Sequence, residues 1–174
     1  MLESIQPHLE FLTETAISNN VRTALECGTE NGHSTLALLK GIRKTGGCLE
    51  SIDINPCHTA VQRVYDERLT QFWNFTKGDS RQHKCLFESL DLLFLDTEHN
   101  ENQVFAELMQ FGHLVKSGGI ILVHDVLIFP NTFNGIAKYL WDVMKDKEDT
   151  YGHNLHWDLN IRTCGCGMLV LRKP

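Results

Sequence analysis

The sequence lacks the residue runs that mark membrane proteins and nucleic-acid-binding proteins. None of its apolar runs approaches the roughly 20 residues that cross a bilayer. It also has no run of Lys or Arg, and its net charge is −6. We therefore expect no membrane partner and no nucleic acid bound through its phosphates. The acidic, amphipathic start MLESIQPHLEF is unlike a secretory signal, so a cytoplasmic protein is expected.

Paired metal-binding cysteines and interdomain linkers are missing as well. The six cysteines are scattered, and the only close pair, Cys164 and Cys166, has C-x-C spacing with no second pair to complement it. A zinc site is not expected there, and reduced thiols are. Without a linker, low-complexity tract or repeat, the 174 residues suit one domain, with an N-terminal helical segment over 1–19 and a core over 20–174.

Strand-like and helix-like segments alternate along the chain. After a helix over 3–18, strands are predicted at 23–28, 48–54, 72–78, 91–96 and 118–126, with helices at 33–44, 59–70, 80–89, 102–115 and 133–146. This alternation predicts an α/β fold with a mostly parallel sheet. Two last strands are predicted at 154–160 and 165–173. The segment that connects them is too short for a parallel crossover, so this pair must be antiparallel.

Each predicted parallel strand ends close to an acidic residue. The five are Glu26, Asp53, Asp79, Asp96 and Asp125. Ligands of open α/β sheets bind at the carboxyl ends of the strands, which places the expected site on this edge. An Asp at such a position can simply cap the next helix. Five carboxylates on one rim repel one another, however, unless a cationic or hydroxyl-rich ligand lies among them.

The glycine turn E-C-G-T-E-N-G-H-S at 26–34 differs from turns that hold phosphate. No Lys follows Gly32, and G-x-x-x-G replaces the dinucleotide pattern G-x-G-x-x-G. Glu26 and Glu30 oppose a phosphate, although the start of a helix favours one. A ligand with an ammonium group and ribose hydroxyls fits this turn better.

The turn, Asp53 and the G-D-S sequence at 78–80 together resemble class I S-adenosylmethionine (SAM)-dependent methyltransferases. Residues 91–126 resemble a subfamily with the pattern D-h-h-h-h-D-x-x-H … L-x-x-G-G-h-h-h-x-H-D, where h is apolar, and the end TCGCGMLVLRK resembles its last strand. The resemblance covers residues 20–172. It implies a Rossmann-like three-layer sandwich whose seven-stranded sheet is mostly parallel with an antiparallel last strand. It also implies methyl transfer to a small-molecule or sugar hydroxyl.

The same resemblance implies which residues hold SAM. Gly28 and Gly32 would let the backbone approach the methionine part, and Glu26 would lie near its amino group. Asp53 would accept hydrogen bonds from both ribose hydroxyls. The remaining cofactor positions are Asp79 and Ser80 at the adenine, Asp96, and Ser34, which either touches the cofactor or only begins a helix.

Catechol-type O-methyltransferases share the architecture that this resemblance implies and use Mg²⁺, held by an Asp after strand four and an Asp-Asn or Asp-Asp pair after strand five. Asp96 and Asp125 match two of these positions, but Val126 at the third cannot ligate. A divalent metal at Asp96 and Asp125 thus stays an open expectation. His124 and His99 suit a transition metal better than Mg²⁺.

His99 takes the place of the family's catalytic Lys. It either accepts a proton from the acceptor, with Asp96 and Asp125 completing the catalytic set, or braces one of these aspartates. His124 should be packed or hydrogen-bonded, with its side chain pointing away from that of Asp125. The apolar loop 127–135 is expected to form an acceptor wall or lid, and a homo-oligomeric partner could complete the pocket.

Two other functions stay open. One is a non-catalytic SAM-binding or interaction module, which Val126 and the missing Lys favour. The other is a nicotinamide-dependent reductase, against which the missing G-x-G-x-x-G and the antiparallel last strand argue.

Overall fold

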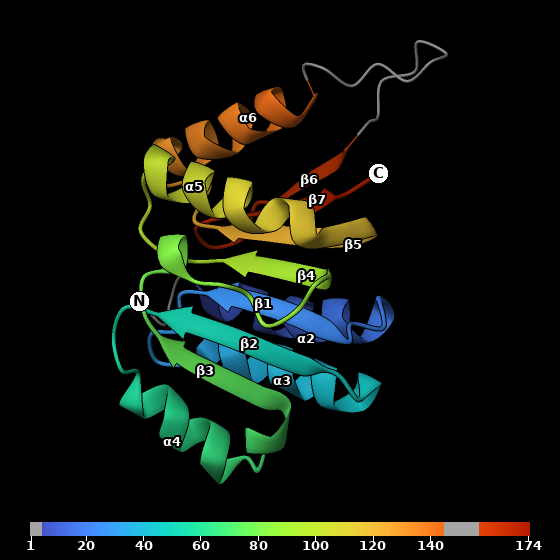
Figure 1. Ribbon diagram of the computed structural model, residues 1–174, viewed down its shortest axis with the longest axis vertical. Helices are drawn as coiled ribbons and strands as arrows, with labels where there is room; N and C mark the ends of the chain where they lie inside the picture. The colour runs from blue at the N-terminus through green and yellow to red at the C-terminus, as the bar shows by residue number, and fades with distance from the viewer. Residues whose placement is uncertain (1–4, 145–156) are drawn as a thin grey trace.

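The computed structural model describes residues 5–144 and 157–174, in which strands and helices alternate (Figure 1). The strands are β1 (Thr23–Cys27), β2 (Cys48–Asp53), β3 (Trp73–Lys77), β4 (Leu90–Leu95), β5 (Val115–His124), β6 (Asp158–Arg162) and β7 (Met168–Arg172). The α-helices are α2 (Leu9–Ser18), α3 (His33–Thr45), α4 (His58–Asp66), α5 (Glu101–Phe111) and α6 (Pro130–Met144). Short 3₁₀ turns are η1 (Gln6–His8), η2 (Thr70–Phe72), η3 (Ser80–Gln82) and η4 (Gly112–Leu114).

All seven strands form one sheet in the order β3-β2-β1-β4-β5-β7-β6. The first five strands are parallel, and β7 lies antiparallel between β5 and β6. The predicted fold class, including the antiparallel ending, is confirmed. The strand order reverses between β1 and β4, and such a switch point opens a crevice at the carboxyl ends of the strands.

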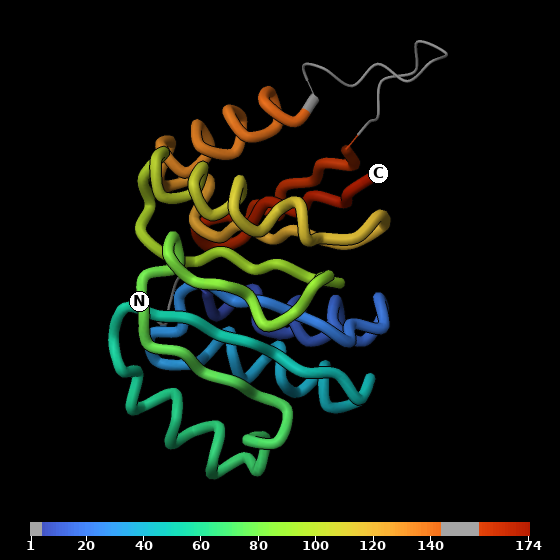
Figure 2. Tube along the Cα trace, viewed as in Figure 1, coloured from blue at the N-terminus to red at the C-terminus, as the bar shows by residue number. Residues whose placement is uncertain are grey.

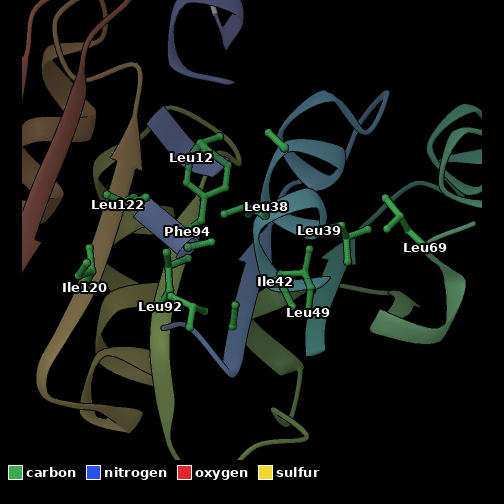
Figure 3. Packing of buried hydrophobic residues seen from close by; sticks show 14 of the residues in the cluster. Leu12, Leu38, Leu39, Ile42, Leu49, Leu69, Leu92, Phe94, Ile120 and Leu122 are labelled. Atoms are coloured by element: carbon green, nitrogen blue, oxygen red, sulfur yellow. The ribbon is translucent and has the colours of Figure 1, made fainter. Parts of the chain in front are cut away.

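The two faces of the sheet are covered by different helices. On β4, Leu92 and Phe94 share a buried cluster with residues of α2 and α3, whereas Leu93 and Leu95 share one with residues of α5 and α6. Figure 3 shows the first cluster, with Phe94 of β4 beside Leu38 of α3. Figure 2 shows the same separation along the Cα trace, with α5 next to α6 and α2 next to α3. Three layers result, as expected when each strand alternates between two apolar faces.

The helix predicted over 80–89 is wrong, because only the single turn η3 forms there. Tertiary contacts hold the next residues in an irregular path. The buried Glu50 carboxylate accepts a hydrogen bond from the Leu86 N–H at 2.8 Å and pairs with His83 at 2.6 Å. Gln110 donates a further hydrogen bond to the His83 carbonyl. These partners satisfy backbone and side-chain groups that a helix would have to rearrange.

Several other boundaries differ from the prediction: α4 ends at Asp66 rather than 70, α5 ends at Phe111 rather than 115, and β5 spans Val115–His124 rather than 118–126. α6 begins at Pro130 rather than 133, because proline suits the first position of a helix. The described part of the penultimate strand is β6, which extends two residues beyond the expected end at 160. Residues 145–146 of the predicted helix and 154–156 of the predicted strand lie outside the described residues. Across the described ranges, no helix has both the length and the apolar character that crossing a bilayer requires.

Candidate active site

A cavity of about 540 Å³ lies at the carboxyl ends of the parallel strands. It brings together most of the residues predicted from the sequence, whereas Glu26 and Gly32 are not among its lining residues. Ile5 also lines it, so the segment before α2 contributes to the wall. The predicted residues that line the cavity are Gly28, Ser34, Asp53, Asp79, Ser80, Asp96, His99 and Asp125.

The two glycines of the turn allow neighbouring parts of the chain to pack closely against its backbone. Gly28 has φ +92°, and a Cβ there would lie 2.0 Å from the carbonyl oxygen of Asp96. Gly32 has φ +79°, and its Cβ would lie 2.6 Å from that of Ala60 in α4. Only glycine tolerates both the left-handed backbone and such contacts. The ends of β1 and β4 can therefore approach one another at the switch point.

Asp53 anchors the turn from the end of β2. Its Oδ2 accepts hydrogen bonds from the N–H groups of Thr29 at 2.9 Å and Glu30 at 3.0 Å, and its Oδ1 accepts one from Asn55 at 2.8 Å. Burial opposes ionisation, but these backbone hydrogen bonds outweigh it and lower the pKa of Asp53. An ionised carboxylate thus lines the cavity and fixes the turn.

Glu26 lies behind the cavity wall and not on its rim. Its side chain points to the α3 side of the sheet and is fully buried. Oε1 accepts a hydrogen bond from Ser34, and Oε2 accepts one each from Thr35 and Ser51, all at 2.7 Å. Burial raises the pKa of Glu26 to about 7, against the effect of the three hydroxyls. In this structure Glu26 holds the first turn of α3, including Ser34 on the cavity side.

The far end of the cavity contains Asp79 and Ser80. Asp79 caps η3 and forms a 2.8 Å ion pair with Arg81. The hydrogen bonds from Arg81 lower the pKa of the partly buried Asp79. Ser80 is buried, and its hydroxyl donates to Glu107 on α5 at 2.5 Å.

Two imidazoles and two carboxylates meet beyond the turn, at the ends of β4 and β5. His124 Nδ1 lies 3.1 Å from Asp96 Oδ1 and 3.1 Å from Asp125 Oδ1. His99 Nε2 lies 3.0 Å from Asp125 Oδ2. Burial opposes ionisation of Asp125, but the hydrogen bond from His99 and the charge of His124 outweigh it and lower the pKa of Asp125.

The expectation that His124 and Asp125 point in opposite directions is wrong. β5 ends at His124, and Asp125 adopts φ +61°, which interrupts the alternation of a strand. Both side chains consequently reach the same point. His124 is buried and hydrogen-bonded to Asp96, as expected.

His99 has both a partner and an available nitrogen. The hydrogen bond with Asp125 raises the pKa of His99 despite its burial. The Phe129 ring stacks on the imidazole with centroids 4.3 Å apart. Among the described residues, none forms a hydrogen bond with Nδ1 of His99. The geometry therefore combines the contact of a brace with a free position for proton transfer.

A family model described as a methyltransferase domain matches residues 25–126, more than half of the chain. The chain belongs to this methyltransferase family. A search of curated protein sequences gave no match.

Solved structures share the fold of this methyltransferase at low sequence identity. The Bacillus cereus O-methyltransferase in complex with SAH is 19% identical, with a TM-score of 0.74 over 97% of this chain and 81% of that one. The SAH-bound methyltransferase PaMTH1 from Podospora anserina is 19% identical, with a TM-score of 0.73 over 94% and 76%. A putative rRNA methylase from Clostridium thermocellum is 13% identical, with a TM-score of 0.66 over 100% and 99%. Proteins described as acting on different acceptors share this fold, so the fold alone does not identify the acceptor.

The sequence-based site of this methyltransferase omitted Gln103 and Glu107. Both lie on the face of α5 that also carries the buried residues Val104, Leu108 and Phe111. Two polar residues four positions apart on an apolar helix face were the available signal, since such a pair is buried only with partners.

Proposed function

We propose that this methyltransferase binds SAM in the cavity and transfers its methyl group to a hydroxyl of a small molecule. The observation that carries the proposal is that one cavity is lined by the Gly28 turn, by Asp53 and by the His99–Asp125 pair. When bound, SAM supplies an electrophilic methyl group on a sulfonium. The carboxylates at the strand ends favour such a cation over a phosphate.

Asp53 is suited to the ribose. Its carboxylate lines the cavity in ionised form, and backbone hydrogen bonds already fix its orientation. The Gly28 turn brings main-chain atoms to the same wall. Binding therefore requires little reorganisation of these groups.

His99 is placed to receive the proton of the acceptor hydroxyl. Asp125 engages Nε2, which leaves Nδ1 to act as the base. Asp125 also stabilises the imidazolium that forms. The same interaction with His99 lowers the pKa of the Asp125 carboxylate. Transfer then depends mainly on alignment of the acceptor oxygen with the methyl group and on exclusion of water.

The surface beside His99 is apolar and is suited to an acceptor. Leu127, Ile128, Phe129 and Phe133 follow β5, and each is more than a third exposed. Because Phe129 also stacks on His99, an acceptor packed on this surface would have its hydroxyl near the base. This favours an acceptor with an apolar or aromatic face beside its hydroxyl.

A divalent metal fits the donor atoms present. One ligand atom each from Asp96, His124 and Asp125 lies within 4.8 Å of the others. Oδ1 of Asp125 is buried without a well-aligned hydrogen bond in the described chain. One imidazole and two carboxylates suit a transition metal better than Mg²⁺, which prefers oxygen ligands. A bound metal would polarise the acceptor oxygen.

Calorimetric titration with SAM and SAH tests the proposal. We expect saturable binding by the unaltered protein and a strong loss of affinity in Asp53→Asn. Asp66→Asn on α4 is the matched control, since Asp66 is exposed and outside the cavity. Absence of heat and of a thermal shift at millimolar ligand would refute SAM binding.

Turnover separates the enzyme from a non-catalytic binding module. Product formation with phenolic, aliphatic or sugar hydroxyls supports the enzyme if His99→Gln abolishes it while SAH affinity is retained. Binding without turnover across this panel would favour the module instead.

A further inference from the structure

We propose that Gln103 recognises the exocyclic amino group of the cofactor's adenine and that Glu107 fixes the orientation of the Gln103 amide. This inference rests on the proposed function, because it assigns a partner to the adenine end of the same cavity. Gln103 lines that cavity from α5, next to Ser80.

The hydrogen bonds around Gln103 have one consistent direction. Its Nε2 donates to Ser80 Oγ at 3.0 Å and to Glu107 Oε1 at 2.7 Å, so the NH₂ end of the amide faces this pair. The Ser80 hydroxyl in turn donates to the same Glu107 oxygen at 2.5 Å. The Thr97 hydroxyl donates to the other oxygen at 2.8 Å. Glu107 is fully buried; burial raises the pKa of Glu107, whereas the hydrogen bonds from Ser80, Gln103 and Thr97 favour its ionised, accepting form.

This arrangement leaves the carbonyl oxygen of Gln103 without a partner in the described chain. A turned amide would place that oxygen 2.7 Å from an oxygen of Glu107, so two acceptors would face one another. Glu107 therefore prevents the amide from turning. The Gln103 carbonyl oxygen is consequently the hydrogen-bond acceptor that is left for a ligand at this position. The Ser80 hydroxyl already donates to Glu107.

An acceptor here selects a ligand with an N–H group. The 6-amino group of adenine is such a donor, whereas hypoxanthine presents an oxygen and unsubstituted purine presents only a hydrogen on carbon. With unsubstituted purine, the buried Gln103 oxygen would have no donor. With hypoxanthine, it would face another oxygen, which adds repulsion. Gln103 thus supplies an acceptor for the amino group in addition to the partly buried Asp79 carboxylate, which also lines the cavity and pairs with Arg81.

The experiment compares SAH with its 6-deamino and 6-oxo analogues by calorimetric titration. For the unaltered protein we expect each analogue to bind about tenfold or more weakly than SAH. In Gln103→Met the affinity for SAH should fall to the affinity that the unaltered protein has for the 6-deamino analogue. Gln110→Met on the same helix is the matched control, since Gln110 bonds to the His83 carbonyl outside the cavity, and it should keep full discrimination.

Glu107→Gln tests the role of Glu107 as a positioning residue. A glutamine at 107 can donate as well as accept, so the Gln103 amide could turn and donate to the 6-oxo group. We expect the preference for SAH over the 6-oxo analogue to shrink while the loss with the 6-deamino analogue persists. A merely structural role would weaken all three ligands by the same factor.

Equal affinity of the unaltered protein for SAH and the 6-deamino analogue would overturn this inference and leave the proposed function intact. Unchanged discrimination in Gln103→Met would do the same. If none of the three ligands binds, both the inference and the proposed function fail. The comparison on the unaltered protein decides the matter even where a variant does not fold.

Discussion

His99 Nε2 lies 3.0 Å from Asp125 Oδ2, so the imidazole is held through one nitrogen, and its Nδ1 has no hydrogen-bond partner among the described residues. We expect His99→Gln to lower the rate of methyl transfer roughly 10²–10⁴-fold, because a positioned base is lost. SAH affinity should stay within a factor of two or so, since the imidazole serves the acceptor side. Rates from saturating assays and calorimetric affinities together check this expectation. An equal loss of rate and affinity would instead indicate a structural brace.

Phe129 should act through the His99 ring that it covers. Phe129→Ala removes a stacked ring at 4.3 Å and part of the apolar wall, so the acceptor KM should rise roughly threefold to tenfold. Trp141→Ala on α6 is the control, because Trp141 is 72% exposed and lies outside the apolar surface formed by Leu127, Ile128, Phe129 and Phe133. Equal kinetics for both variants would exclude this wall as an acceptor contact.

Substitutions at Gly28 and Gly118 distinguish the cost of backbone strain from the cost of a steric clash. Gly118→Ala places a Cβ in open space at φ +76° and should lower the free energy of unfolding by about 1–2 kcal/mol. Gly28→Ala adds a clash with the Asp96 carbonyl and should cost more than ~4 kcal/mol. Urea unfolding of both variants measures the difference. Similar losses would mean that β1 and β4 can separate at little cost.

Glu26 predicts how stability depends on pH. Its pKa of about 7 in the folded protein exceeds the usual 4.5, so the folded state binds more protons between these values. Stability from this group is therefore greatest below about pH 4.5 and is lost as the pH rises through about 7. Glu26→Gln lacks this dependence. Relative to the unaltered protein, the variant should gain up to ~3 kcal/mol between about pH 5 and about pH 8 in urea unfolding. Parallel profiles would show that the folded pKa of Glu26 is ordinary.

Metal dependence follows from the Asp96, His124 and Asp125 set. After treatment with EDTA, activity should return with Mn²⁺ or Co²⁺ more fully than with Mg²⁺. The thermal shift caused by Mn²⁺ should disappear in Asp96→Asn and persist in Asp66→Asn. Full activity after removal of metal would indicate that the His124 ring alone joins the two carboxylates.

Features that repeat along the chain were predictable from the sequence. The parallel strands and the antiparallel ending followed from apolar runs and from the short link between β6 and β7, and acidic strand ends identified the edge that carries the cavity. Such patterns are local, so one sequence is sufficient to recognise them.

Features that depend on tertiary partners were not predictable. The segment after η3 follows the buried carboxylate of Glu50, which is distant in sequence. Glu26 faces α3 because of its position in the β1 pleat, although its charge suggested the rim. The convergence of His124 and Asp125 depends on one backbone angle, which no periodicity reports.

That backbone angle has a thermodynamic consequence. A non-glycine residue at φ +61° is strained by about 1 kcal/mol or more, and Asp125 also lies buried among ionisable neighbours. Asp125→Gly should therefore raise the melting temperature above that of Asp125→Ala while both variants lose methyl transfer. The end of β5 is thus a place where relief of backbone strain by glycine would remove one carboxylate of the proposed site.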